Sequence, residues 1–244
     1  MSMPKQGTIN PSFRRRPESR TRHTHGERTY KLSGQFFLKP LVFLLGLLPA
    51  LWVAWQFYAD LLGANPIDEI ADASGSWTLR FLMITLVMTP LKRLSGWYWP
   101  IRIRRMLGLF AFFYAALHLF TYLWLDQFFD WGEIALDILD RPFITVGMLA
   151  FVLLLPLAIT SNRAMVKRLG RHWKKLHRLA YVIPLLGVLH FWWLVKADIL
   201  EPLIYALVLA VLLLVRLPRP SLKEIKGTEG LKNVQQQFSV PPNR

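Results

Sequence analysis

The sequence predicts an all-α membrane protein, a six-transmembrane-helix bundle with both termini cytoplasmic. Of its 244 residues, 53% are hydrophobic and only 18% are charged, a composition unlike that of an ordinary soluble domain. Six segments come close to the roughly 20 apolar residues that a helix needs to cross the hydrocarbon core of a bilayer. Lys and Arg are concentrated in alternate connections between these segments, as they are in the cytoplasmic loops of membrane proteins.

The six predicted spans follow one another within a membrane domain of residues 38–217. They cover residues 40–62, 76–94, 106–125, 143–160, 179–195 and 199–217. The second span is interrupted by Arg80 near one end and by Pro90 near the other. We retain it because residues 81–91 carry no charge and because a long Arg side chain can reach from a helix end to the membrane surface.

The charge distribution predicts the orientation. Residues 1–39, 92–105, 161–178 and 216–244 contain 27 of the 30 Lys and Arg but only four of the 15 acids. Because Lys and Arg are retained in cytoplasmic loops, these four segments are predicted to face the cytoplasm. Topology therefore accounts for the formal charge of +15 without nucleic-acid binding. The acidic outer loop 126–140 is predicted to contain a short amphipathic helix on the outer surface.

Two polar segments flank the membrane domain. Residues 1–37 are predicted to be a basic disordered N-terminal arm, either simply solvated or lipid-binding, without the apolar core of a cleavable signal peptide. Residues 218–244 are predicted to be a polar C-terminal tail, too short for a nucleotide-binding fold, and the sequence has no Gly-rich phosphate loop. If the protein does redox chemistry, its electrons must therefore come from another molecule.

The residue types available for chemistry are limited. The chain has no Cys, which excludes thiolate-held clusters, Cys-type zinc sites and thiol nucleophiles. Among six His, only His118, His177 and His190 lie in or at a predicted span. An ionisable side chain in a span costs a few kcal/mol and indicates a function, whereas the structural alternative is a hydrogen bond between helices.

Two of these histidines, His118 and His190, are predicted to lie at a similar depth in the membrane. At a rise of 1.5 Å per residue, His118 lies about 10 Å from the outer end of the third span and His190 about 9 Å from that of the fifth. Two neutral imidazoles at one depth on facing helices suit a six-coordinate b-type heme. The sequence therefore predicts heme held between helices 3 and 5, with His118 and His190 as its metal ligands.

His177 is a candidate for a second heme, at the inner end of the fifth span. It lies about 20 Å inward of His190 and roughly 140° from it around a straight helix, although Pro184 between them permits a kink. The same level of the third span carries Arg104 and Arg105, which as cations cannot bind iron. The pattern indicates one heme and leaves open whether His177 binds another.

Short motifs surround these histidines. They are RRMLGL at 104–109, ALHL at 116–119, WKKLH at 173–177 and LHFW at 189–192, with GANP at 63–66 and MTPL at 88–91 after the first two spans. Together they resemble the MsrQ/YedZ family, the heme-binding membrane subunits of the bacterial periplasmic methionine-sulfoxide reductase system, within the ferric-reductase-like transmembrane group. The resemblance covers approximately residues 38–217, and the long basic arm is not typical of the family.

The resemblance implies a function. It implies heme b, FMN, electron input from the quinone pool or a cytosolic flavin reductase, and delivery across the bacterial inner membrane to a periplasmic molybdopterin methionine-sulfoxide reductase. The chain would be an electron-transfer subunit that supports repair of oxidised periplasmic proteins, with the substrate chemistry on its partner. Basic residues such as Arg104 and Lys174 could hold a flavin phosphate or heme propionates, but no sequence feature selects among them.

Two alternatives remain at this level. One is a stand-alone ferric reductase, which the missing nucleotide domain disfavours. The other is a membrane transporter or assembly factor whose intramembrane His residues relay protons or stabilise packing.

Overall fold

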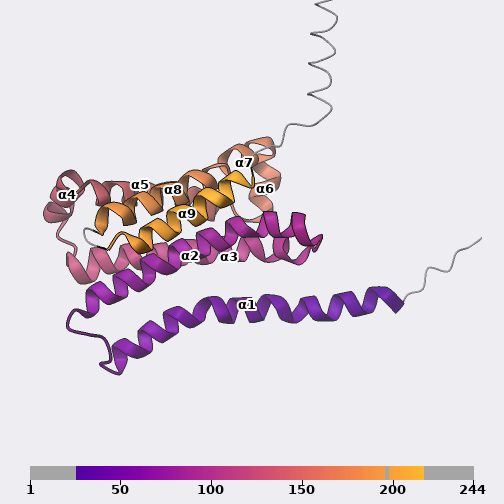
Figure 1. The fold of residues 1–244 in the computed structure, drawn as a ribbon, viewed down its shortest axis with the longest axis horizontal. Coiled ribbons are helices and arrows are strands. Elements are labelled where there is room, and N and C mark those ends of the chain that lie inside the picture. Colours follow the sequence, from indigo (N-terminus) through magenta and orange to yellow (C-terminus); the bar gives the residue numbers. More distant parts are fainter. Residues whose placement is uncertain (1–25, 196–197, 217–244) are drawn as a thin grey trace, which may run out of the picture. The chain divides into compact units, whose positions relative to one another are not determined.

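The computed structural model describes residues 26–195 and 198–216, with side chains from Phe37 onward. The chain divides into two compact units after Leu38, and the arrangement below concerns the second unit. Helices make up the regular structure of the described residues, which contain no strand, so the all-α prediction is confirmed there (Figure 1). The helices are α1 Gly26–Tyr58, α2 Pro66–Ser95, α3 Trp99–Phe120, α4 Trp131–Asp140, α5 Pro142–Ile159, α6 Arg163–Leu169, α7 Arg171–Leu176, α8 Leu179–Leu194 and α9 Leu200–Leu214.

Each of the six predicted spans coincides with a helix, namely α1, α2, α3, α5, α8 and α9. Within the described residues, three helical stretches have the length and composition needed to cross a membrane: Phe37–Tyr58, Trp99–Asp126 and Pro142–Ile159. Helix α9 is apolar but shorter, and α8 has 16 residues. Six membrane crossings and two cytoplasmic termini therefore stay predictions.

The two flanks differ in what the structure describes. Helix α1 begins at Gly26, so the last part of the predicted arm, 1–37, is helical. Glu, Arg and Lys are good helix formers, and this composition lets the helix start before the apolar segment. Residues 1–25 and the predicted tail, 218–244, lie outside the described residues.

Local sequence signals set the helix ends. Prolines occupy the first turns of α2, α3 and α5, where a missing N–H removes no helical hydrogen bond. The Asp130 carboxylate accepts hydrogen bonds from the amides of Gly132 and Glu133 and so caps α4. Helix α4 confirms the predicted helix within residues 126–140. Its position on the outer surface stays a prediction.

A segment of wider helix follows α3 directly. Helix α3 continues into a π-helical segment, η1, at Thr121–Asp126, which begins three residues after His118. The Thr121 hydroxyl donates to the carbonyl of Leu117 at 3.0 Å. Such wide turns inside helices occur frequently at functional sites.

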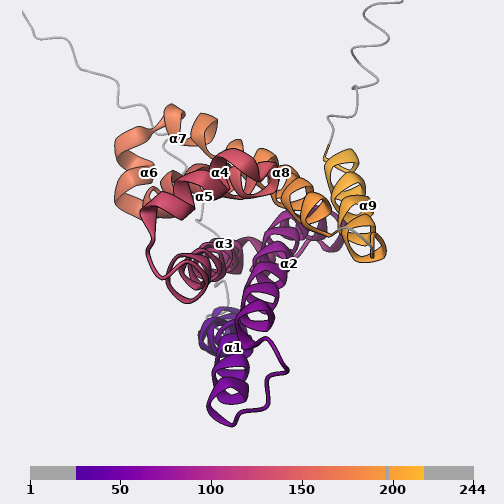
Figure 2. The same cartoon turned by 90° about the vertical axis from the view of Figure 1, so that its left-hand side faces the viewer.

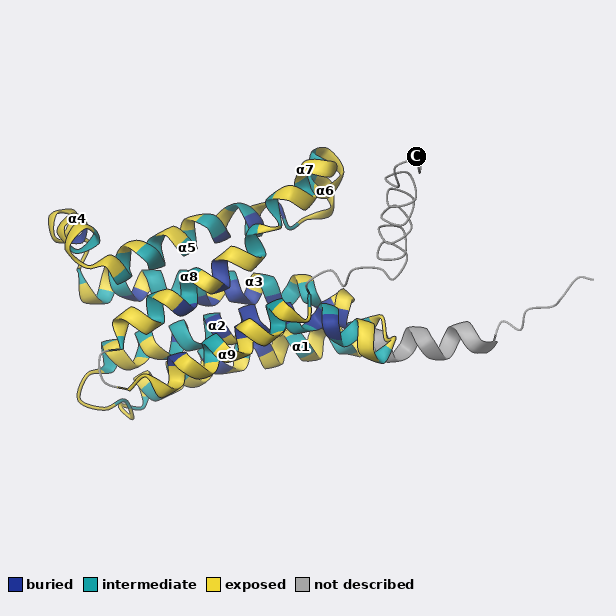
Figure 3. Cartoon of the chain, turned by 45° about the horizontal axis from the view of Figure 1, so that its top comes forward, coloured by how far each residue is buried: buried dark blue, intermediate teal, exposed yellow. Residues whose placement is uncertain are grey.

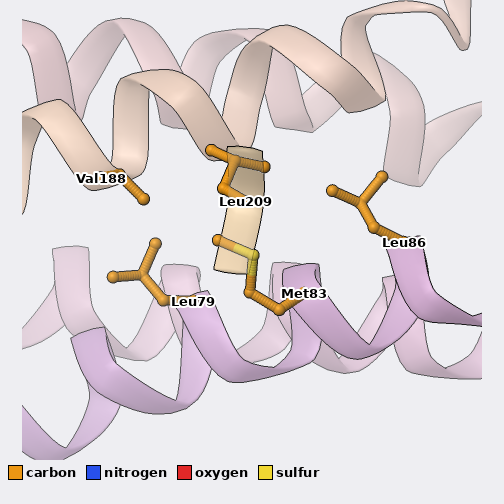
Figure 4. Packing of buried hydrophobic residues seen from close by; sticks show 5 residues of the cluster. All are labelled: Leu79, Met83, Leu86, Val188 and Leu209. Carbon is orange, nitrogen blue, oxygen red and sulfur yellow. The ribbon is translucent and has the colours of Figure 1, made fainter. Parts of the chain in front are cut away.

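The second unit is built around two helix pairs. Helix α2 packs along α3, and α5 packs along α8. Helix α2 also contacts α8 and α9, and Figure 2 shows it between α3 and α9. Where α2, α8 and α9 meet, the buried side chains form one apolar cluster: Leu79, Met83 and Leu86 from α2, Val188 from α8 and Leu209 from α9 (Figure 4). This cluster fixes α8, and with it His190, against α2.

The outer surfaces of the helices are apolar. Many large side chains of α1 are more than half exposed, among them Leu41, Leu44, Leu48, Leu51 and Trp55. Their spacing of three or four residues puts them on one face of the helix, and Figure 3 shows exposed residues along the outsides of the helices. A continuous apolar face of this size is what contact with lipid requires.

Helix α1 is tied to α3 through a break in its own hydrogen-bonding ladder. Pro49 lies inside α1, has no N–H to donate and crowds the preceding turn. The Tyr114 hydroxyl donates to the Gly46 carbonyl at 2.8 Å and accepts from the Ala50 amide at 3.0 Å. Those two backbone groups would bond each other in a regular helix, so the hydroxyl is inserted between them.

We expect Tyr114→Phe to destabilise the protein. Loss of the hydroxyl leaves the Gly46 carbonyl and the Ala50 amide without their partner in an apolar region, which costs about 1–3 kcal/mol. Tyr98→Phe is the matched control, since Tyr98 is exposed. The measurement is the unfolding midpoint of the purified protein in detergent. Equal midpoints for wild type, control and Tyr114→Phe would contradict the role given to the hydroxyl.

Candidate functional site

The structure brings His118 of α3 and His190 of α8 together inside the second unit. Their ring centroids are 6.1 Å apart and their planes differ by 81°. Both side chains are half-buried. The pair lies among α2, α3, α5 and α8, because α2 and α5 supply the groups that each imidazole contacts.

Each imidazole uses Nδ1 to reach a backbone carbonyl. His118 Nδ1 lies 2.9 Å from the carbonyl oxygen of Ala71 in α2, and 3.4 Å from the Ser74 hydroxyl. His190 Nδ1 lies 2.5 Å from the carbonyl oxygen of Phe143 in α5. A carbonyl only accepts, so Nδ1 must carry the proton and donate it. The neutral ring then presents an unprotonated Nε2, which is the form that binds a metal.

The separation of the rings fits one metal ion between them. Metal–imidazole bonds of about 2 Å on opposite sides of an iron would put the two ring centres roughly 6 Å apart. The observed distance is 6.1 Å. Two imidazoles suit a heme iron in particular, because the porphyrin supplies the other four ligands. The residue types and the separation of the rings therefore fit heme ligation.

His177 lies away from this pair. It follows α7, and its Nε2 is 3.2 Å from the hydroxyl of Thr160 at the end of α5. Its ring stacks on Trp173 at 4.0 Å, and the Trp173 indole N–H donates to the Thr160 carbonyl at 3.0 Å. Burial, followed by the positive charge of Arg104, lowers the pKa of His177 below its usual value. Among the described residues, its recorded side-chain contacts are thus with Thr160 and Trp173 and not with another histidine.

Two arginines lie at the same end of the second unit as His177. Arg104 of α3 donates to the Thr89 hydroxyl at 3.2 Å. Arg216 donates to the Tyr181 hydroxyl at 3.1 Å and to the Leu86 carbonyl. In the part of the chain that is described, the only ion pair joins Arg141 to Asp137. Neither Arg104 nor Arg216 therefore has a carboxylate partner there.

Comparison with known proteins identifies the family. The model of the family "Ferric reductase like transmembrane component" matches residues 74–188. Relatives named protein-methionine-sulfoxide reductase heme-binding subunit MsrQ include that of Azospira oryzae, 57% identical over 178 residues, covering 72% of this chain and 76% of the relative. The relative from Herminiimonas arsenicoxydans is 57% identical, over 73% of this chain and 84% of the relative. The relative from Rhodospirillum rubrum is 55% identical, over 72% of this chain and 85% of the relative. The chain belongs to the MsrQ family.

Family membership confirms the resemblance predicted from the motifs. MsrQ proteins here fall within the ferric-reductase-like transmembrane group, so membership and the apolar helices together make this chain a membrane protein. The matched range contains His118 and His177 and ends two residues before His190. Membership favours a redox function over a transporter or assembly factor.

The sequence alone does not distinguish the two glycines beside the histidine pair, Gly75 and Gly147, from other helical glycines. A Cβ added to Gly75 of α2 would lie 3.2 Å from His118 Nδ1, and one added to Gly147 of α5 would lie 2.8 Å from His190 Nδ1. The one available signal is that glycine inside a helix is unfavourable by about 1 kcal/mol relative to Ala, so it usually has a packing reason. That signal applies equally to other helical glycines, such as Gly108 and Gly187.

Proposed function

We propose that this MsrQ family member is a membrane cytochrome b that binds one heme b through His118 and His190. It would pass electrons across the inner membrane to a periplasmic methionine-sulfoxide reductase. The observation that carries the proposal is the pair of imidazoles 6.1 Å apart, each with Nδ1 on a backbone carbonyl. The names of its relatives, heme-binding subunits of such a reductase, support it.

The chain's own residues would set the properties of the cofactor. Bound heme supplies reversible one-electron transfer. His118 and His190 would hold the iron, while the carbonyls of Ala71 and Phe143 keep the proton on each Nδ1. A hydrogen bond to the far nitrogen of an axial imidazole orients the ring and raises its basicity. Helices α2 and α5 therefore contribute to ligation without binding iron themselves.

Electron input is proposed on the cytoplasmic side, from the quinone pool or a cytosolic flavin reductase. For the FMN that the family resemblance implies, Arg104 and Arg216 are the candidate phosphate site. Both contact the same stretch of α2, Arg104 through Thr89 and Arg216 through Leu86, without a carboxylate partner among the described residues, and guanidinium groups suit phosphate. The Nε of Arg216 is buried without a hydrogen-bond partner in the described part, so it is a further donor that a bound group could use.

Heme ligation is tested by substitution. We expect purified wild-type protein to show a reducible, low-spin b-type spectrum, and His118→Ala and His190→Ala each to abolish it, because each removes one axial ligand. His172→Ala is the matched control, since His172 is exposed in the basic helix α7. The measurement is the heme content per polypeptide together with the reduced-minus-oxidised spectrum. Stoichiometric low-spin heme in both single variants would reject the proposal.

The same series defines the role of His177. With its Nε2 on Thr160, we expect His177→Ala to keep the heme of His118 and His190 and to slow its reduction by a cytosolic donor. If heme content instead falls from two per polypeptide to one, His177 binds a second heme. Heme content and reduction rate identical to wild type would leave His177 a structural residue only.

Electron delivery to the partner is tested separately. The proposed periplasmic docking face is α4, where Glu133 and Asp140 are exposed, while Asp130 caps the helix and Asp137 pairs with Arg141. Heme is reduced in membranes, the periplasmic reductase is added with and without oxidised substrate, and reoxidation is followed. We expect substrate-dependent reoxidation that weakens as salt rises, since the screening length is about 8 Å at physiological ionic strength. No reoxidation at any ionic strength would reject the function, and salt-independent reoxidation only the docking face.

A further inference from the structure

The two histidines are held by the same local arrangement, repeated on two helices. The carbonyl that accepts from His118 belongs to Ala71, and the one that accepts from His190 belongs to Phe143. Each is followed four residues later by a glycine, Gly75 in α2 and Gly147 in α5. In an α-helix, the residue four positions on supplies the amide that already bonds such a carbonyl. Each carbonyl therefore serves its own helix and an imidazole of a neighbouring helix.

Glycine is needed because of the direction in which helical side chains point. The Cβ of residue i+4 leans toward the helix N-terminus and covers the surface of the preceding turn, where the carbonyl of residue i lies. A Cβ on residue 147 would be 2.8 Å from His190 Nδ1 and 2.9 Å from its Cε1. A Cβ on residue 75 would be 3.2 Å from both of the corresponding atoms of His118. Any side chain at these positions would occupy the approach of the imidazole to its carbonyl.

Other helical glycines of the second unit do not share this relation. A Cβ on Gly108 would have the Thr85 methyl as its nearest neighbour, at 4.0 Å. A Cβ on Gly187 would lie 2.9 Å from the end of the Leu79 side chain, so that glycine serves apolar helix packing. Gly187 is nevertheless in α8, three residues before His190, and so is a close structural comparison for Gly147.

We propose that Gly75 and Gly147 are positioning residues, each of which opens a helix carbonyl to the Nδ1–H of an axial imidazole. The carbonyl and the glycine together set the rotation and the tautomer of the ring. On α2 they act on His118, and on α5 they act on His190. The inference rests on the proposed binding of heme by His118 and His190. It adds that the redox properties of the site depend on two residues that do not touch the iron.

The proposal predicts the sign of a change in potential. A methyl group at either position pushes the imidazole away from its carbonyl and weakens the Nδ1–H···O bond. The ring then becomes a weaker electron donor, ferric iron is stabilised less, and the midpoint potential rises. The effect is larger for Gly147→Ala, because its contact is closer and leaves less room for adjustment.

The experiment compares four variants of the full chain: Gly75→Ala, Gly147→Ala, and the controls Gly108→Ala and Gly187→Ala. Two quantities are measured on purified protein, the midpoint potential and the rate of heme transfer to an excess of an apoprotein acceptor. We expect both Gly75→Ala and Gly147→Ala to raise the potential and to speed heme loss, by roughly tenfold or more for Gly147→Ala, as for other changes behind a metal ligand. The two controls are expected to match wild type in potential.

The outcomes separate this inference from the proposed function. Wild-type potential and heme-loss rate in Gly75→Ala and Gly147→Ala, with heme lost in His118→Ala and His190→Ala, would overturn the glycine role alone. An equal shift in Gly187→Ala would also overturn it, by assigning the effect to helix packing. Heme retained in both histidine variants would instead reject the proposed function. If Gly147→Ala retains no heme, the milder Gly75→Ala decides between these results.

Discussion

The structure depends on one constraint: an imidazole inside an apolar bundle must place its Nδ1–H on an acceptor that the protein itself provides. An unpartnered polar group costs several kcal/mol where no water is available, and helix carbonyls are the commonest acceptors there. Those carbonyls are already bonded within their own helices. His118 and His190 meet the constraint by sharing the carbonyls of Ala71 and Phe143, beside glycines that leave room for a second donor.

The packing of four helices brings the two imidazole rings to one place. Helices α2 and α3 bring Ala71 to His118, and α5 and α8 bring Phe143 to His190. The apolar cluster that joins α2, α8 and α9 then holds the two pairs against each other. At the end of the unit near His177, Thr160 connects α5 to the histidine that precedes α8. Four helices thus position the pair of imidazoles, although the histidines themselves lie on only two.

The sequence predicted the features that depend on the length and regular rise of a helix. Apolar segment lengths located the six helices, and a rise of 1.5 Å per residue related His118 to His190, whose rings the structure brings together. It could not reach features set by how neighbouring helices rotate against each other. These include the carbonyl partners of the histidines, the surroundings of Gly75 and Gly147, the contact of His177 with Thr160, and the contacts of Arg104 and Arg216 with one stretch of α2. The start of α1 at Gly26 was missed because charged residues can continue a helix beyond its apolar part.

The central claim is that one iron lies between the imidazoles of His118 and His190. Electron paramagnetic resonance of the purified ferric protein tests it most directly, because the signal reports both the number of axial imidazoles and the angle between their planes. With ring planes 81° apart, we expect a low-spin ferric signal with the large principal g value that near-perpendicular imidazoles produce. A high-spin ferric signal from the stoichiometrically loaded protein, meaning that one axial position lacks a strong ligand, would contradict it.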